Sequence, residues 1–441
     1  MNKDKYDVAI IGGGIGGLAA AARLAAAGYK PIILEKQEVL GGRYTAADYK
    51  GYRITSAAYY IVHPDGPVIQ LLRDMGVESQ VEIAPAPEPY LKYRIDGKDH
   101  PIPRKGGTLA LLPTVAGVEE AERVQAAFRR AMRWQEPVDE ISFGDWLSQY
   151  TDNKKIHQVF NMMCMGASGG VLSSTPAGDF IRVIRAYGKY GGAWVLPRGH
   201  LKPLVDAVVG AIKSRGGEIR IRTKVKQILI DGLRVRGVLA EADGKGLEIE
   251  AKAVISDCSP HDMIKMAGEE NFDKGYLNKV QQIKTAEMFN IIWGCDKPMF
   301  DWPGVINFAQ YDDFYHVFYS MDFSLTWRDL APEGKYMLWA GFILPPEYDI
   351  KKEIERGIRQ CKENFPDLEK QGELLLVQVF RKTWPGLWAT GGSDLGQRTP
   401  VENLYVVGDG AKPSGYCMAE GVTEGARLAV EDIKGRIKPE S

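Results

Sequence analysis

A glycine-rich turn near the N-terminus constrains the fold more than any other feature of the chain. Residues 6–36 read YDVAIIGGGIGGLAAAARLAAAGYKPIILEK, in which an apolar run leads into glycines, an alanine-rich stretch and a second apolar run. Gly12, Gly14 and Gly17 fit the spacing GxGxxG, and Glu35 ends the second apolar run. Because glycines admit a tight turn and let the backbone approach a diphosphate, this order predicts a dinucleotide-binding βαβ unit.

The same unit indicates how a dinucleotide would be held. The helix after the glycines directs unpaired amides and a partial positive charge at its N-terminus towards phosphate groups. Glu35 can accept hydrogen bonds from ribose hydroxyls and would repel a 2′-phosphate. The alternative is a glycine-rich turn that binds nothing, but strand, glycines, helix and terminal acid all occur here in the expected order.

Three further segments resemble a flavoprotein family. They are Leu40-Gly41-Gly42-Arg43, the stretch IRTKVKQI at 221–228, and TPVENLYVVGDG at 399–410, which precedes a helical pattern. Together with the first unit they resemble the FAD-binding family that contains amine oxidases, phytoene desaturases and protoporphyrinogen oxidase. The pattern resembles most the phytoene desaturase branch, with carotenoid isomerase and retinol saturase. The resemblance implies these cofactor-binding residues: Gly12, Gly14, Gly16, Gly17, Glu35, Lys36, Gly42, Arg43, Val225, Gly408, Asp409 and Met418.

The resemblance also implies a role for several of these residues. By this resemblance, Arg43 would lie near the diphosphate and the flavin, where a forked cation suits phosphate oxygens. By the same resemblance, the backbone of Val225 would hold the adenine, and Asp409 would contact the ribityl or diphosphate part. The following helix directs its N-terminus at the flavin carbonyl edge, where negative charge builds on reduction. A surface salt bridge for Arg43, a core position for Val225 and an ordinary turn for Asp409 are the alternatives.

These segments predict an α/β fold. A discontinuous, Rossmann-like FAD-binding domain carries an inserted α+β substrate domain. We expect the FAD-binding domain to comprise residues 1–65, 195–262 and 390–441, and the substrate-binding domain residues 66–194 and 263–389. The first insert has an apolar stripe at helical spacing, and the second has strands and helices such as residues 350–364. The stripe consists of Val118, Ala121, Val124, Phe128 and Ala131.

The second insert is rich in aromatic residues, which suits a cavity for an apolar or aromatic substrate. An aromatic core is the alternative for any single ring. The predicted pocket residues are Trp293, Tyr315, Tyr319, Trp339 and Trp384.

Three residues are candidates for catalysis. Tyr60 and His63 follow the Gly42-Arg43 segment closely, and His63 can act as an acid or base because its ordinary pKa is ~6.5. A histidine before a proline also serves as a loop hydrogen-bonding residue, which is the alternative. The stretch SGYCMAEGVTEGARLA resembles the family's tyrosine-bearing turn, but the helix alignment puts Cys417 at the tyrosine position and Tyr416 one residue away. No histidine pair has metal-ligand spacing, so we predict no metal.

The resemblance implies an FAD-dependent oxidoreductase of the dehydrogenase or desaturase type. It would transfer a hydride between a carbon–hydrogen bond of a largely apolar or aromatic substrate and flavin N5. A flavin amine oxidase is the alternative, but the strand expected at 285–296 lacks the lysine common in those enzymes. Residues 384–392 also lack the cysteine that anchors flavin in some of them, so we expect noncovalent FAD. A non-enzymatic binding protein like the GDP-dissociation inhibitors is a third possibility.

Charge and hydropathy exclude other classes of partner. The 56 basic residues nearly balance the 57 acidic ones, so we expect no nucleic-acid partner. Apolar runs fall short of the ~18 residues that span a bilayer, and a strand pattern begins too early for a signal peptide. We therefore expect a cytoplasmic protein without a transmembrane segment, for which peripheral membrane contact stays open. The electron acceptor can be oxygen, a quinone or another protein.

Overall fold

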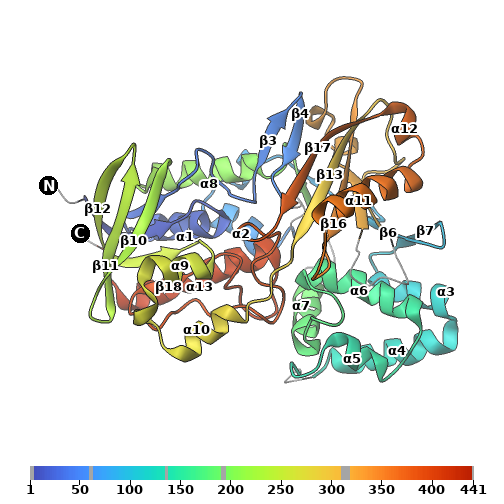
Figure 1. Ribbon diagram of the computed structural model, residues 1–441, viewed down its shortest axis with the longest axis horizontal. Helices are drawn as coiled ribbons and strands as arrows, with labels where there is room; N and C mark the ends of the chain where they lie inside the picture. Colours follow the sequence, from blue (N-terminus) through green and yellow to red (C-terminus); the bar gives the residue numbers. More distant parts are fainter. Residues whose placement is uncertain (1–3, 59–62, 135–137, 190–194, 309–317, 440–441) are drawn as a thin grey trace.

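The computed structural model describes residues 4–58, 63–134, 138–189, 195–308 and 318–439. Within these residues most strands belong to two seven-stranded sheets, and two smaller sheets have two strands each. Figure 1 shows one large sheet towards the left, near both ends of the chain, and the other at the upper right, with a group of helices below it. The chain thus forms two parts, each built on its own sheet.

The first large sheet contains the βαβ unit that the sequence predicts. Its strand β1 (Asp4–Ile11) pairs in parallel with β2 (Pro31–Leu34) and with β12 (Lys245–Ser256). The strand order is β10-β11-β12-β1-β2-β9, and β18 pairs with β12 in parallel. The other strands are β9 (Glu218–Arg220), β10 (Thr223–Asp231), β11 (Arg234–Ala242) and β18 (Leu404–Val406). All lie in the segments predicted for the FAD-binding domain, whose boundaries stay a prediction.

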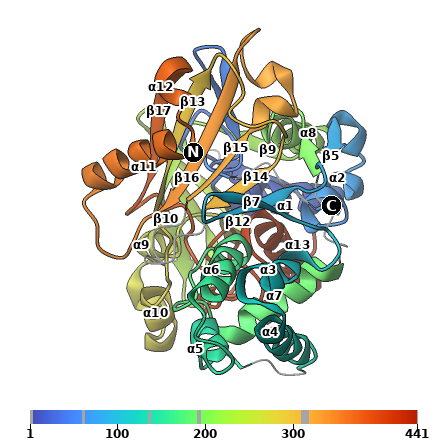
Figure 2. The ribbon, with the colours of Figure 1, turned by 90° about the vertical axis from the view of Figure 1, so that its right-hand side faces the viewer.

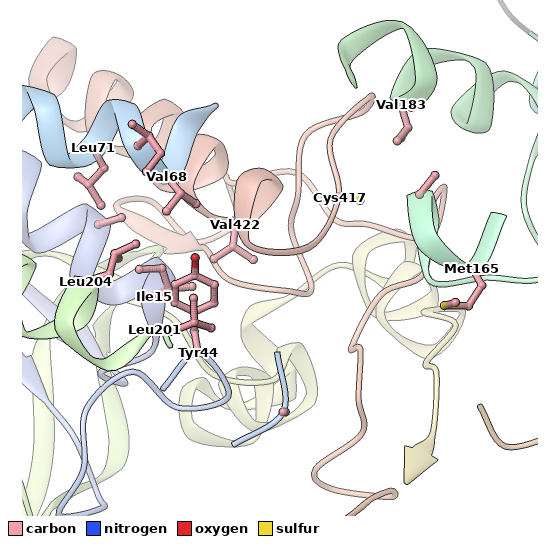
Figure 3. Close-up of a cluster of buried hydrophobic side chains, with 14 of the residues drawn as sticks. Ile15, Tyr44, Val68, Leu71, Met165, Val183, Leu201, Leu204, Cys417 and Val422 are labelled. Atoms are coloured by element: carbon pink, nitrogen blue, oxygen red, sulfur yellow. The ribbon is translucent and has the colours of Figure 1, made fainter. Parts of the chain in front are cut away.

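Four helices pack together beside this sheet. Helix α1 (Ile15–Ala26) contacts α8 (Lys202–Ser214) and α13 (Met418–Arg436), and α2 (Pro67–Asp74) packs on α13. All alanines of α1 except the last, Ala26, are buried, and their small side chains let these neighbours approach closely. Figure 3 shows this core, in which Ile15, Leu204 and Val422 surround Tyr44. Two further helices are α9 (Pro260–Ala267) and α10 (Lys274–Gln281).

The second large sheet has the order β17-β13-β16-β15-β14-β6-β7. Its strands are antiparallel except for β14 and β6, which run parallel. The strands are β6 (Leu91–Ile95), β7 (Lys98–Ile102), β13 (Met288–Cys295), β14 (Val305–Phe308), β15 (Phe318–Asp322), β16 (Tyr336–Ile343) and β17 (Gly372–Phe380). Helices α11 (Ile350–Asn364) and α12 (Leu368–Gln371) lie at one side of this sheet, as Figure 2 shows.

The helices below the second sheet form an aromatic core of their own. They are α3 (Leu112–Ala116), α4 (Val118–Ala131), α5 (Phe143–Ser148), α6 (Lys154–Ser168) and α7 (Ala177–Lys189). The ring centroids of Phe143 and Phe180 are 4.3 Å apart, and Phe128 contacts both rings. The predicted stripe of α4 is buried except at its first residue. Val118 is 63% exposed, because it starts the helix at the edge of this core, so its placement in the stripe was wrong.

Short elements complete the fold. The short strands are β3 (Ala46–Tyr49), β4 (Tyr52–Thr55), β5 (Ile83–Pro85) and β8 (Val195–Pro197). The 3₁₀ helices are η1 (Glu78–Gln80), η2 (Gly107–Leu111), η3 (Glu269–Asn271), η4 (Phe323–Leu325) and η5 (Arg328–Leu330). In the described part of the chain, every helix is too short or too polar to cross a lipid bilayer.

Candidate functional site

One large cavity joins the two parts of the molecule. Its volume is about 1540 Å³, and its lining includes Gly12 and Gly14 of the first part and Tyr93 and Met165 of the second. Sites for single small molecules have volumes of ~300–1,000 Å³. The cavity is therefore large enough for a dinucleotide together with a second molecule.

The glycine-rich turn at one wall of this cavity has the geometry of a diphosphate cradle. Gly12 has φ +103°, a conformation that favours glycine, and a Cβ on Gly17 would overlap the carbonyl oxygen of Gly12. Gly14 is the N-cap residue of α1 and lines the cavity, so the helix N-terminus faces the cavity. Gly16 and Gly17 do not line the cavity themselves but let α1 approach the ends of β12 and β18. The turn thus fits the predicted cofactor.

Glu35 lies at the cavity edge, directly after β2. Its Oε2 accepts a hydrogen bond from the Gly13 amide at 2.7 Å, and its Oε1 accepts one from the Gln37 amide at 2.8 Å. These bonds hold the carboxylate in place and leave it further acceptor capacity for hydroxyl groups. Lys36 and Val225 border the same cavity. This arrangement suits the binding of a ribose and its base, which the sequence predicts for this edge.

Arg43 contacts two segments that are distant from it in sequence, residues 384–386 and Asp409. Its guanidinium is 2.9 Å from Asp409 and donates to the carbonyls of Pro385 at 3.0 Å and Gly386 at 2.6 Å. The Trp384 ring lies over this guanidinium, at 5.7 Å. Arg43 is mostly buried, so the ion pair is not a surface salt bridge, and its role towards phosphate stays a prediction.

Asp409 lies in a buried charge network that sequence reasoning missed. Nζ of Lys412 is 3.2 Å from Asp409 Oδ1 and 2.9 Å from Asp394 Oδ1. Burial acts to raise the pKa of Asp409, but Lys412 and Arg43 outweigh it and hold that pKa below its usual range. Burial raises the pKa of Asp394 to about 6, against the effect of Lys412. The sequence does show Lys412 three residues after Asp409, but no neighbouring sequence pattern indicates that it pairs with Asp394 and Asp409.

Asp257, just after β12, is a second residue that the sequence did not single out. Its Oδ2 accepts a hydrogen bond from the Gly17 amide at 2.8 Å, within the first turn of α1. Burial, together with Glu35 and Asp409, raises the pKa of Asp257 to about 7, although the Gly17 amide and Arg43 lower it. The sequence feature that could have identified Asp257 is its position directly after a buried parallel strand, because ligands of such sheets bind at that edge.

His63 borders the cavity between its two parts and is 1% exposed. Its ring lies 4.8 Å from that of Tyr187, and the Tyr187 hydroxyl is hydrogen-bonded to the Cys417 thiol. In Figure 3, Cys417 lies on the loop that runs between the core around Tyr44 and helices α6 and α7. Burial raises the pKa of the Cys417 thiol to about 12, so this thiol is neutral near pH 7.

Glu420, in the first turn of α13, holds the His63 segment. Its carboxylate accepts hydrogen bonds from the amides of His63 at 3.0 Å and Val68 at 2.8 Å. Burial raises the pKa of Glu420 to about 7, although both hydrogen bonds lower it. Sequence reasoning missed Glu420 and Tyr187, because their partners come from distant segments.

The wall of the cavity in the second part is mainly apolar. Apolar lining side chains there come from β6, β13–β16 and α6. They include Leu91, Tyr93, Met162, Met163, Met165, Met288, Val305, Tyr319, Met321 and Ile343. Methionine side chains adapt to ligands of varied shape, so this wall suits an apolar molecule without fixing its outline.

The predicted pocket aromatics divide into three groups. Tyr319 and Trp384 line the cavity. Trp293 does not, because the alternation of β13 turns it away from Met288 and into the core against α11. Trp339 is fully buried beneath the rings of Tyr319 and Phe323 and does not line the cavity either. Tyr315 lies outside the described residues.

Of the candidate catalytic residues, only some line the cavity. His63 lines the cavity, whereas Tyr60 lies outside the described residues. Tyr416 is half-buried and does not line the cavity, but Cys417 and Met418 do, as do Gly408, Asp409 and Gly42. Among the residues that the structure describes, no cluster of histidine, cysteine or carboxylate side chains could hold a metal ion.

Comparisons with known proteins identify the family and the fold of this chain. The model of the flavin containing amine oxidoreductase family matches residues 15–434. The 15-cis-phytoene desaturase of Capsicum annuum is 23% identical over 97% of this chain and 77% of that protein. The crystal structure of an oxidoreductase from Methanosarcina mazei has a TM-score of 0.85 and 26% identity, covering 97% of this chain and 100% of that one.

A more distant neighbour is a putrescine oxidase bound to putrescine. It has a TM-score of 0.72 at 16% identity and covers 98% of this chain and 99% of that one. At this identity the likeness shows the fold alone. These neighbours confirm the predicted α/β fold with a Rossmann-like nucleotide-binding part.

Proposed function

We propose that this chain, which belongs to the flavin containing amine oxidoreductase family, is a dehydrogenase or desaturase that binds FAD noncovalently. It would transfer a hydride between a carbon–hydrogen bond of a largely apolar or aromatic substrate and flavin N5. Family membership makes the protein a flavin-dependent oxidoreductase that acts on a small molecule. The observation that carries the finer proposal is the single cavity that joins the glycine-rich turn to an apolar wall.

The residues around the turn support FAD as the flavin. FAD has a diphosphate and an adenosine, for which the turn of Gly12, Gly14 and Gly17, the Glu35 carboxylate and the Val225 edge are suited. When bound, FAD supplies a ring that takes up or returns a hydride. The N-terminus of α13 faces the same cavity at Met418 and would stabilise negative charge there.

The wall opposite the turn supports an apolar substrate. Methionine and aromatic side chains line it, and burial there keeps water away from the reacting carbon. His63 and Tyr187 border this region and are two side chains that could hold or move a proton, at a ring nitrogen or at the phenol oxygen. Strand β13 contains no lysine, which favours a dehydrogenase over an amine oxidase.

Anaerobic reduction of the purified flavoprotein tests the proposal. Saturated and unsaturated lipids and aromatic acids form one panel, and primary and secondary amines form the other, with flavin absorbance as the readout. Bleaching by the first panel supports the proposal. Bleaching by amines alone contradicts it and favours the amine oxidase, the second candidate that the family name supports. A colourless protein that refuses added FAD would contradict both and favour a binding protein without flavin.

The electron acceptor can be found on the reduced protein. Reoxidation by air, by a quinone or only by a cell extract would distinguish oxygen, a quinone and a protein acceptor. A quinone acceptor would also agree with peripheral contact at a membrane, while the expected cytoplasmic location can be checked by cell fractionation.

A further inference from the structure

A carboxyl group lies inside the glycine-rich cradle itself. Besides its bond with the Gly17 amide, Asp257 approaches the backbone so closely that added methyl groups would collide with it. A Cβ on Gly14 would be 2.5 Å from Asp257 Oδ2, and one on Gly16 would be 2.6 Å from Oδ1. Asp257 also lines the cavity. An acidic side chain therefore lies where the glycines let a diphosphate approach.

The charged groups around Asp257 do not neutralise it. Glu35 at the end of β2 and Asp409 after β18 are both acidic, and Arg43 is the cation that acts on Asp257. Arg43 is already paired with Asp409 and bonded to two carbonyls. The turn between β1 and α1 has no ionisable side chain, and the ionisable residues that follow Asp257 on its own segment are Cys258, His261 and Asp262.

We infer that Asp257 is part of the diphosphate site and that it holds the cofactor as a neutral acid. One carboxyl oxygen accepts the hydrogen bond from the Gly17 amide, and the other carries the proton and can donate it to a diphosphate oxygen. FAD binding then takes up one proton from solvent whenever Asp257 is ionised beforehand. This inference rests on the proposed binding of FAD.

The sign of the pH dependence follows from charge. An ionised Asp257 beside the negative diphosphate is repelled, so the bound state favours the protonated form. Without the cofactor the pKa of Asp257 is already raised to about 7, by burial and by Glu35. The affinity for FAD should therefore be constant below pH 7 and fall above it. The dissociation constant should rise about tenfold per pH unit, or about 100-fold by pH 9.

A titration of the flavin-free protein with FAD from pH 6 to 9, followed by flavin fluorescence, tests this. Asp257→Asn keeps the size of the side chain and an acceptor for the Gly17 amide, but it cannot ionise. We expect this variant to bind FAD at pH 9 as tightly as the wild-type protein does at pH 6. Asp231→Asn, at the exposed end of β10 and outside the cavity lining, is the matched control and should keep the pH dependence.

Calorimetry in two buffers of different ionisation enthalpy counts the protons taken up. The wild-type protein should take up close to one proton per FAD near pH 8 to 9, and Asp257→Asn none. FAD binding without proton uptake would overturn the inferred role of Asp257, and so would a pH dependence that persists in Asp257→Asn. Neither result would contradict the proposed function. If Asp257→Asn fails to fold, the proton count on the wild-type protein decides. A wild-type protein that binds no FAD at any pH overturns the proposed function as well.

Discussion

Replacing Lys412 with methionine would leave two buried carboxylates without their shared cation. The side chain of Lys412 is 2% exposed, and its Nζ lies 2.9 Å from Asp394 and 3.2 Å from Asp409. Nζ also donates to the carbonyls of Asp409 at 2.6 Å and Ala389 at 2.9 Å. Methionine keeps most of the apolar contact but removes the charge and the donors. Breaking a buried ion pair in this way costs about 3–5 kcal/mol of unfolding free energy.

The loss should depend on pH. Burial raises the pKa of Asp394 to about 6 even beside Lys412. Removing the cation should raise that pKa further and should also raise the pKa of Asp409, which Lys412 helps to hold low. A carboxyl whose pKa is higher in the folded than in the unfolded protein adds stability at low pH, which is lost as pH rises through the folded value. The Lys412→Met substitution should therefore lower the free energy of unfolding most at pH 8 and clearly less at pH 5.

Urea unfolding followed by tryptophan fluorescence at both pH values measures this loss. The double variant Lys412→Met with Asp394→Asn should recover part of it, because one of the two unpaired charges is gone. Lys434→Met is the control, since Lys434 is 40% exposed in its pair with Glu431 and should contribute less than about 1 kcal/mol. A loss below about 1 kcal/mol for Lys412→Met at pH 8, or an equal loss at both pH values, would refute the reasoning.

Two further substitutions test the cradle and the His63 segment. Gly17→Ala should abolish FAD binding, because the added methyl overlaps the Gly12 carbonyl, whereas Gly210→Ala in α8 meets nothing within 4 Å and should keep one FAD per chain. Equal FAD content in the two variants, by absorbance after release, would contradict this. Glu420 has a pKa raised by burial from 4.5 to about 7, so the stability of the wild-type protein relative to Glu420→Gln should fall by about 1.4 kcal/mol per pH unit between those values. Unfolding temperatures of both proteins from pH 5 to 8 measure this difference, and parallel curves would contradict it.

Local patterns predicted the elements whose stability is local. Helix α11 spans Ile350–Asn364, the range expected from its periodicity, and the Asp349 side chain caps it at 2.9 Å from the Lys351 amide. The unit β1-α1-β2 was predictable because its glycines, alanines and apolar runs each have one structural use. The same unit predicted that Glu35 ends the second strand, where it lines the cavity.

Contacts between distant segments were not predictable in this way. The bond between Asp257 and Gly17 joins residues 240 positions apart, and the one between Tyr187 and Cys417 joins residues 230 apart. Aromatic density identified the second sheet but not the orientation of each ring. Trp293 faces α11, a placement that depends on which side of β13 the helix covers.

The most direct test of the account is the amount and kind of flavin in the purified protein. Acid precipitation, followed by chromatography of the supernatant, measures both in one step. The account predicts close to one FAD per chain, released intact and free of the polypeptide. Flavin that stays with the precipitate, FMN in place of FAD, or a protein that cannot be loaded with FAD would contradict it.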